Sequence, residues 1–236
     1  MRVTRARRHR AAVAIVAVFV PVLLIGTAVH VLAHGWFPRV EIGRLSPEPY
    51  GMTQGQRTAL ARTALDSIVP FGGGDRVLRE ARLPSGGPAF DDKERNHLRV
   101  VRHYVFGLYL IHAAGLLALV GLALVRRTRS IVRDGLAAGA LFTLGVAAFV
   151  GIYVAVSPVS FLGGFHRFFF SGDSWRFAET ETLRRVFPDR FWSDTAVVLG
   201  GLVAVQAVSL LGGAYYWRRQ AIRPQPRTAA HAGHRT

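Results

Sequence analysis

The feature that most constrains this chain is a set of four long apolar runs that contain no Asp, Glu, Lys or Arg. The runs cover residues 11–33, 104–125, 135–156 and 195–217. Each has about 20 residues, the length that a helix needs to cross a hydrocarbon core of about 30 Å. The sequence therefore predicts an all-α membrane protein with four transmembrane helices at these positions.

Arginine clusters beside the runs predict the orientation of the chain. They are Arg2, Arg5, Arg7, Arg8 and Arg10; Arg126, Arg127, Arg129 and Arg133; and Arg218, Arg219, Arg223 and Arg227. Four crossings bring all three clusters to one side, and basic residues beside spans mark the cytoplasmic side. We therefore expect a cytoplasmic N-terminus (1–10), a cytoplasmic loop (126–134) and a cytoplasmic, disordered tail (218–236). Because the arginines lie beside the spans, we interpret the net charge of +16 as a feature of a membrane protein and not of a nucleic-acid-binding protein.

The first run also has features of a signal peptide, namely a basic start, an apolar core and small residues near Ala33. It is long for the apolar part of such a peptide, and its retention gives an even number of crossings. We therefore expect a retained span. Because the chain has no cysteine, disulfides and thiolate chemistry are excluded.

Two long segments, 34–103 and 157–194, are expected outside the cytoplasm, with short interfacial helices. In the first, Thr53 and Gln56 have the spacing of a capping box. An apolar stripe with helical spacing follows at Leu60, Ala64 and Ile68. In the second segment, a short amphipathic helix is expected before Pro188.

Of nine histidines, His97 and His166 lie in the outer segments with polar neighbours. Glu94 precedes His97 by three residues, which places both side chains on one face of a helix. A carboxylate that holds one imidazole nitrogen fixes the tautomer and raises the basicity of the other nitrogen, as general-base catalysis requires. An exposed helical ion pair would have the same spacing.

His166 lies within the aromatic stretch FLGGFHRFFFSGDSW. Phe165 and Phe169 are four residues apart, as are His166 and Phe170, so a helix would turn aromatic rings to the membrane interface and His166 to protein. Arg167 is its neighbour. At this depth an imidazole could act as a base on a lipid ester, although any interfacial loop could show such a pattern.

Together these stretches resemble a family of four-helix bacterial membrane proteins that includes the lipoprotein intramolecular transacylases. The family carries E-x-x-H-L/M before the second span, then F-H-x-x-F-F, W and P-x-x-F-F/W-x-D after the third. Here these motifs occupy 94–98, 165–170, Trp175 and 188–194, and PYGMTQGQR at 49–57 is similar to a further family element.

The resemblance implies an O-to-N acyltransferase in the bacterial cytoplasmic membrane, with its active face outside the cytoplasm. Such an enzyme moves the sn-2 acyl chain of a diacylglyceryl-cysteine lipoprotein to the α-amino group of that cysteine. Its partners would be the bilayer and a diacylated lipoprotein or another membrane lipid ester, and no cofactor or metal is implied. The family's two motif histidines correspond to His97 and His166. The chain departs from the family at Val100, where an Asp is usual.

The expected mechanism uses His97, oriented by Glu94, as general base. His166, with Arg167 nearby, would donate a proton to the oxyanion or to the leaving alkoxide, and the two histidines could exchange roles. A metal-dependent membrane hydrolase with Glu94, His97 and His166 as ligands is an alternative. Haem held by His30 and His112 is another alternative, and a non-catalytic membrane scaffold that binds lipid or partner helices is a third.

Overall fold

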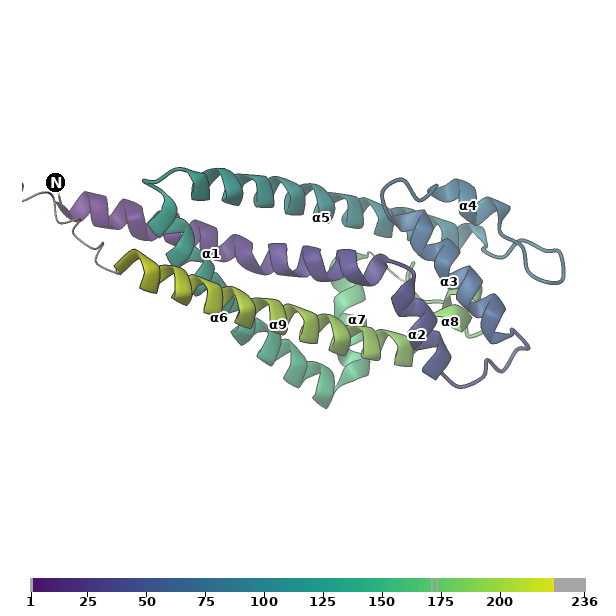
Figure 1. Cartoon of the computed structure of the whole chain (residues 1–236). Coiled ribbons are helices and arrows are strands. Elements are labelled where there is room, and N and C mark those ends of the chain that lie inside the picture. The colour runs from purple at the N-terminus through teal and green to yellow at the C-terminus, as the bar shows by residue number, and fades with distance from the viewer. Residues whose placement is uncertain (1, 171, 173, 223–236) are drawn as a thin grey trace, which may run out of the picture.

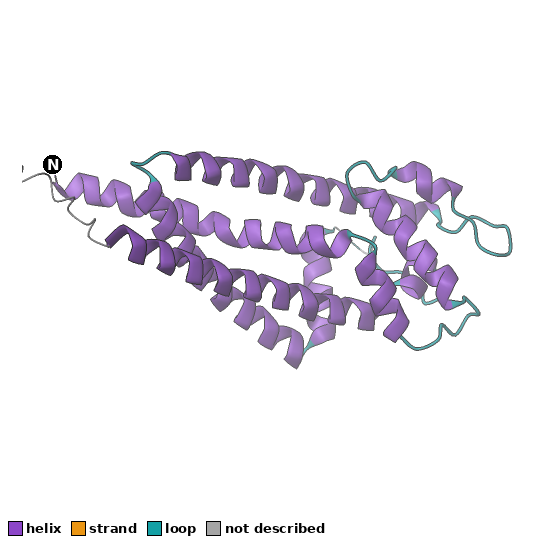
Figure 2. Ribbon diagram, viewed as in Figure 1, coloured by secondary structure: helices purple, strands orange, loops and turns teal. Residues whose placement is uncertain are grey.

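The computed structural model describes residues 2–170, 172 and 174–222, and within them the chain is almost entirely helical (Figures 1 and 2). The helices are α1 (Arg2–Ala33), α2 (Trp36–Arg44), α3 (Gln54–Ile68), α4 (Asp75–Glu80), α5 (Asp92–Leu124), α6 (Arg129–Val156), α7 (Pro158–Phe169), α8 (Thr182–Val186) and α9 (Asp189–Ile222). In this part of the chain the β pairing is limited to an isolated bridge between Arg82 and Pro88.

Four of the described helices are long and apolar enough to cross a membrane: α1, α5, α6 and α9. They contain the four predicted runs except Val125, the residue after α5, and this confirms the predicted number of spans. All four helices extend beyond their runs into polar sequence. The largest extension is in α5, which begins at Asp92, twelve residues before the apolar run, and so carries the E-x-x-H motif on the same helix as a span.

The ends of these helices fall into two groups (Figure 1). The start of α1, the α5–α6 connection and the end of α9 lie at one end of the molecule, so the described parts of the arginine clusters gather there, as predicted. Helices α2, α3, α4 and α8 lie at the opposite end. The prediction of a disordered tail from residue 218 was wrong for residues 218–222, which continue α9 as helix, and residues 223–236 lie outside the described residues.

Small residues bring α1 and α6 into direct contact. A Cβ added at Gly135 would lie 2.6 Å from the Val16 side chain, and one added at Gly139 would lie 2.5 Å from Val20. The glycines of α9 differ, because a Cβ added at Gly200, Gly201, Gly212 or Gly213 would have nothing within 4 Å. Close helix packing through glycine therefore occurs in the third span but not at these positions of the fourth.

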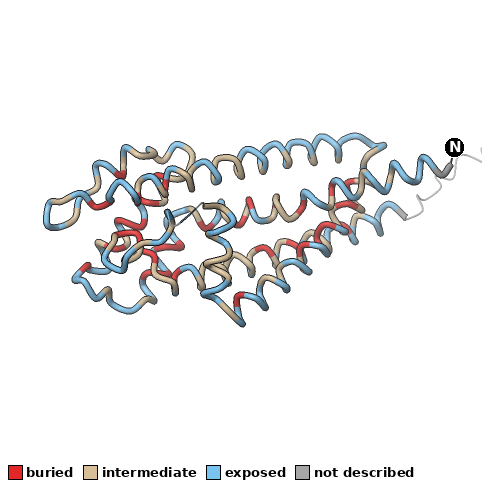
Figure 3. Tube along the Cα trace, turned by 180° about the vertical axis from the view of Figure 1, so that it is seen from behind, coloured by how far each residue is buried: buried red, intermediate tan, exposed pale blue. Residues whose placement is uncertain are grey.

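Helix α5 packs much less closely along its apolar run. No residue in its most apolar stretch is buried (Figure 3). It approaches α1 at Gly26, where an added Cβ would lie 2.7 Å from the His112 ring. There Nε2 of His112 donates to the Thr27 hydroxyl oxygen at 3.0 Å, because that hydroxyl itself donates to the Leu23 carbonyl.

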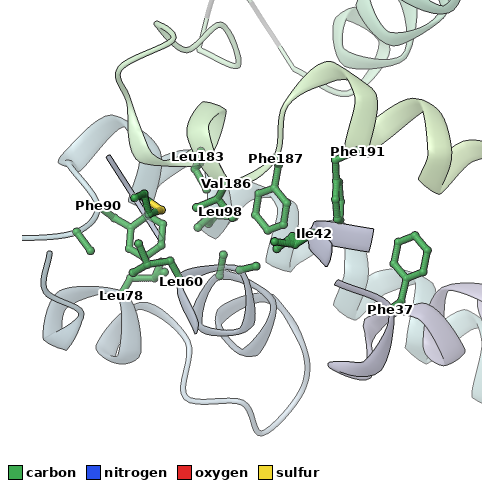
Figure 4. Packing of buried hydrophobic residues seen from close by; sticks show 14 of the residues in the cluster. Phe37, Ile42, Leu60, Leu78, Phe90, Leu98, Leu183, Val186, Phe187 and Phe191 are labelled. Carbon is green, nitrogen blue, oxygen red and sulfur yellow. The ribbon is translucent and has the colours of Figure 1, made fainter. Parts of the chain in front are cut away.

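The short helices enclose an apolar core at their end of the molecule (Figure 4). Its buried side chains come from every element there and from the starts of α5 and α9; they include Phe37, Ile42, Leu60, Leu78, Phe90, Leu98, Leu183, Val186, Phe187 and Phe191. This core joins the two predicted outer segments, because residues before the second span pack against residues after the third.

Local signals set the ends of several helices. Thr53 and Gln56 form the predicted capping box of α3, and Asp91 and Glu94 form a second one at α5. Helix α8 ends before Pro188, as expected. The six-residue α4, which begins directly after Gly72, Gly73 and Gly74, was not predicted.

We predict that Gly139→Ala lowers the free energy of unfolding by about 1–3 kcal/mol, because the added methyl overlaps Val20 and the Ala17 carbonyl. Gly145→Ala in the same helix is the matched control, since a Cβ there has nothing within 4 Å. Thermal unfolding in detergent measures both. Equal stability of the two variants would contradict the close α1–α6 contact.

Candidate active site

Two imidazoles from distant parts of the sequence meet at the end of the molecule that holds the short helices. His97 lies in the second turn of α5, and His166 lies in the last turn of α7. Their ring centroids are 6.5 Å apart and the ring planes differ by 23°. The structure therefore brings together the two histidines that the sequence singled out.

Aromatic rings surround this pair on several sides. Phe170 stacks on His97 at 4.6 Å between centroids and lies 5.9 Å from His166. Trp175 stacks on His166 at 4.8 Å, and Phe177 meets His97 edge-on at 5.2 Å. The predicted helical turn at 165–170 is thus present, but Phe170 contacts both histidines and does not turn away from them.

The hydrogen bonding of His166 fixes its neutral tautomer. Its Nδ1 lies 2.8 Å from the Leu162 carbonyl oxygen, which can only accept, so Nδ1 carries the proton and Nε2 keeps its lone pair. Burial lowers the pKa of His166 below its ordinary value of 6.5, although the Leu162 carbonyl and the charge of Asp189 act in the opposite direction. The ring is therefore mainly neutral at pH 7 and can accept a proton at Nε2.

His97 has a different environment. It is half-buried, and its Nδ1 is buried without a hydrogen-bond partner among the described residues. The aromatic rings around it solvate an imidazolium poorly. Since no acceptor holds one of its nitrogens, the structure leaves the tautomer of His97 free to follow a bound substrate.

Glu94 does not form the hydrogen bond to His97 that the sequence led us to expect. It is 2% exposed, and its Oε1 accepts the Leu183 backbone N–H at 2.6 Å while Oε2 accepts the Asp91 N–H at 2.9 Å. The cause is its place in the capping box, which turns the carboxylate back toward the helix start. Glu94 thus joins α5 to the first turn of α8 and positions the segment that follows α7.

Two further residues hold this segment in place and were not identified from the sequence. Lys93 donates to the Arg176 carbonyl at 2.6 Å, pairs with Glu181 at 3.3 Å and lies over the Phe177 ring. The Tyr104 hydroxyl donates to the Phe169 carbonyl at 2.9 Å. The available signal for Lys93 was its position beside Glu94 as the only lysine in the chain.

A cleft of about 560 Å³ opens beside the imidazoles. It is lined by Tyr104, Arg167, Phe168, Phe169, Phe170, Gly172, Trp175 and Arg176. Phe170 and Trp175 belong both to the cleft and to the ring cluster, so the cleft adjoins His166 and His97. Arg167 is exposed in this cleft, where its charge can act on a bound group, and it follows His166 by one residue on the same helix.

The ligand sets of two alternatives are not assembled. Among the residues that the structure describes, no group of three His, Cys, Asp or Glu side chains could hold a metal ion, and both Glu94 oxygens accept backbone N–H groups. For haem, His112 Nε2 is bound to Thr27, while His30 packs against the rings of His34 and Tyr109.

Comparisons with known proteins agree with this architecture. The family described as lipoprotein intramolecular transacylase Lit matches residues 13–192. An uncharacterized protein from Aquifex aeolicus (strain VF5) is 26% identical over 202 residues, which make up 84% of this chain and 88% of that protein.

Solved structures show the same fold. The membrane integral lipoprotein intramolecular transacylase Lit from Bacillus cereus has a TM-score of 0.76 at 15% identity, over 92% of this chain and 98% of that chain. A variant of that protein with a histidine replaced by arginine has a TM-score of 0.73 at 16% identity, over 92% and 95% of the two chains.

We predict that Glu94→Ala lowers the free energy of unfolding by about 2–4 kcal/mol, because it leaves the N–H groups of Leu183 and Asp91 without their acceptor. Thermal unfolding in detergent measures the loss. Glu80→Ala, which removes an exposed carboxylate paired with Arg76, is the control and is expected to change little. A loss no larger than that of the control would contradict the role of Glu94 as the link between α5 and α8.

We also predict that the His166 ring titrates with a midpoint below 6.5, because burial disfavours its charged form. Since the unfolded chain then binds a proton more readily than the folded one, this group makes the free energy of unfolding fall as pH drops below 6.5. Nitrogen chemical shifts of labelled histidine, assigned with His166→Gln, measure the midpoint. A midpoint at or above 6.5 would contradict the buried site.

Proposed function

Since the chain belongs to the lipoprotein intramolecular transacylase family, we propose that it moves the sn-2 acyl chain of a diacylglyceryl-cysteine lipoprotein to the α-amino group of that cysteine. The observation that supports this activity for the present chain is the imidazole pair, His97 and His166, beside a cleft. Two groups that can give and take protons are what an O-to-N acyl transfer requires.

The reaction forms one bond and breaks another within the same substrate. The α-amino nitrogen attacks the ester carbonyl, a tetrahedral oxyanion forms, and the C–O bond to the glyceryl oxygen then breaks. The nitrogen loses a proton and the glyceryl alkoxide gains one, so no co-reactant is consumed. Because the amine and the ester belong to one molecule, correct positioning can contribute up to about 7–11 kcal/mol.

The two histidines take different roles in this proposal. His166 is the base, because the Leu162 carbonyl holds its Nδ1–H and leaves the Nε2 lone pair free. His97 donates the N–H of its neutral ring to the oxyanion, because the aromatic rings around it disfavour its imidazolium. The imidazolium that forms on His166 then returns the proton to the leaving alkoxide. This reverses the assignment expected from the sequence, in which Glu94 oriented His97, since both oxygens of Glu94 accept backbone N–H groups. Arg167 stabilises negative charge from the adjoining cleft.

The proposed location is a bacterial cytoplasmic membrane with the imidazoles on its outer side. The described parts of the arginine clusters gather at the opposite end of the molecule, which supports a cytoplasmic position for that end. Helix α7 then lies in the outer interface. It has no buried residue, and Phe165 and Phe168 are exposed on it as an interfacial helix requires. The substrate ester, anchored in the outer leaflet, would reach the cleft at headgroup depth.

We predict that the protein converts a diacylated lipoprotein to the N-acylated, S-monoacylglyceryl form in a bacterium that lacks lipoprotein N-acyltransferase. Mass spectrometry of the lipoprotein's N-terminal peptide detects the product. His97→Ala and His166→Ala are each expected to reduce it at least about 100-fold, because the first removes the donor to the oxyanion and the second removes the proton-transfer group. His103→Ala is the matched control, since His103 is an exposed histidine of α5, the helix that carries His97, and its Nδ1 bonds to the Arg99 carbonyl.

An unmodified diacylglyceryl cysteine beside well-expressed parent protein would contradict the proposed reaction. Full conversion by either active-site variant would contradict the histidine mechanism while leaving the reaction in place. Loss of product with His103→Ala as well would indicate that the variants act through folding.

A further inference from the structure

A second cavity lies far from the imidazoles, at the end of the molecule that carries the arginine clusters. It is a groove of about 500 Å³ between α1 and α6. Its lining comprises His9, Arg10, Val13, Ala14, Ala17, Val18, Asp134, Ala138 and Phe142. The proposed acyl transfer makes no use of this groove.

The side chains that line the groove change from polar to apolar along its length. The two helices run in the same direction, so residues four apart on each mark equal steps into the membrane: His9 and Asp134 first, then Val13 and Ala138. Three of the apolar residues are alanines, and these small side chains leave the space. Phe142 lies at the end of the groove that is farther from the arginine clusters, and its side chain is 55% exposed, so the groove is open toward lipid.

Positive charge dominates the polar end. The carboxylate of Asp134 is paired with Arg133 at 2.9 Å and lies 3.9 Å from His9 Nε2. Arg10 is exposed and makes no ion pair with any described residue. An approaching anion would therefore meet the guanidinium of Arg10 and the His9 ring, with the one local carboxylate already neutralised.

We infer that this groove binds one diacyl phospholipid with an anionic headgroup. The phosphate lies beside Arg10 and His9, and one acyl chain follows the apolar wall formed by Val13, Ala17 and Phe142. This arrangement matches the order of polar and apolar groups along a lipid, and basic pockets between helices at the cytoplasmic surface suit anionic headgroups.

The charges argue against a second copy of the chain as the occupant. A copy in the same membrane would have the same orientation and would bring its own arginines to the same depth, beside Arg5, Arg7 and Arg8. Cation would then face cation. An anionic lipid offers the opposite charge at that depth and apolar surface below it.

The test is native mass spectrometry of the full chain in detergent with equal amounts of phosphatidylglycerol and phosphatidylcholine that carry the same acyl chains. We expect one phosphatidylglycerol to be retained in preference. Arg10→Ala is expected to reduce its occupancy about fivefold, whereas Arg5→Ala, which removes the same charge from the same helix outside the groove lining, should leave it unchanged.

A second pair of variants tests the apolar wall. Ala14→Trp fills the groove from an exposed position and should displace the lipid, while Ile15→Trp, on an exposed neighbour outside the lining, should not. An excess of sn-glycerol 3-phosphate should fail to displace the lipid, because it lacks acyl chains.

Four results would overturn the inference. Equal retention of both lipids by the parent protein, or equal losses in Arg10→Ala and Arg5→Ala, would show that the groove has no preference for an anionic headgroup. Displacement of the lipid by sn-glycerol 3-phosphate would show that the groove binds the phosphate group alone and does not require acyl chains. A dimer that Ala14→Trp abolishes would make the groove an interface between copies.

Discussion

The arrangement of the candidate site depends on the buried carboxylate of Glu94. Its two oxygens accept N–H groups from Asp91, at the start of its own helix, and from Leu183, which lies after the third span. A buried carboxylate without such partners would cost several kcal/mol, so the two segments cannot separate without a large penalty. His97 is one helical turn from this bond. The bond therefore fixes the position of the first imidazole relative to the chain that carries Phe170, Trp175 and Phe177.

The aromatic cluster has a chemical effect as well as a packing effect. Phe170 and Trp175 stack on His166 and exclude water from its faces, and the Leu162 carbonyl binds the one proton that the neutral ring carries. Burial favours the uncharged imidazole by lowering its pKa, and the Leu162 carbonyl, although it acts on the pKa in the opposite direction, fixes the lone pair at Nε2. A carboxylate partner would favour the imidazolium instead. Burial therefore keeps this imidazole mainly neutral even though the charge of Asp189 acts in the opposite direction.

Features that depend on neighbouring residues could be predicted from the sequence, and those that depend on distant contacts could not. The four apolar runs were sufficient to predict the spans, because a backbone in lipid must satisfy its hydrogen bonds internally. The capping box at Thr53 was predictable for a similar local reason. The Leu183 partner of Glu94 and the Arg176 partner of Lys93 lie more than 80 residues away in sequence. Spacing on one helix suggested His97 as the partner of Glu94, but the tertiary contact with α8 replaced it.

The continuity and exposure of α5 connect the site to the thickness of the bilayer. One unbroken helix carries His97 and the apolar run that begins at Tyr104, about 10 Å farther along the axis. Because no residue in its most apolar stretch is buried, that run faces the surrounding hydrocarbon over much of its surface. Helix α7, which carries His166, contains none of the four apolar runs. The Tyr104 hydroxyl, at the first residue of the run, nevertheless donates to the Phe169 carbonyl of α7, so a tilt of α5 in the bilayer carries both imidazoles with it.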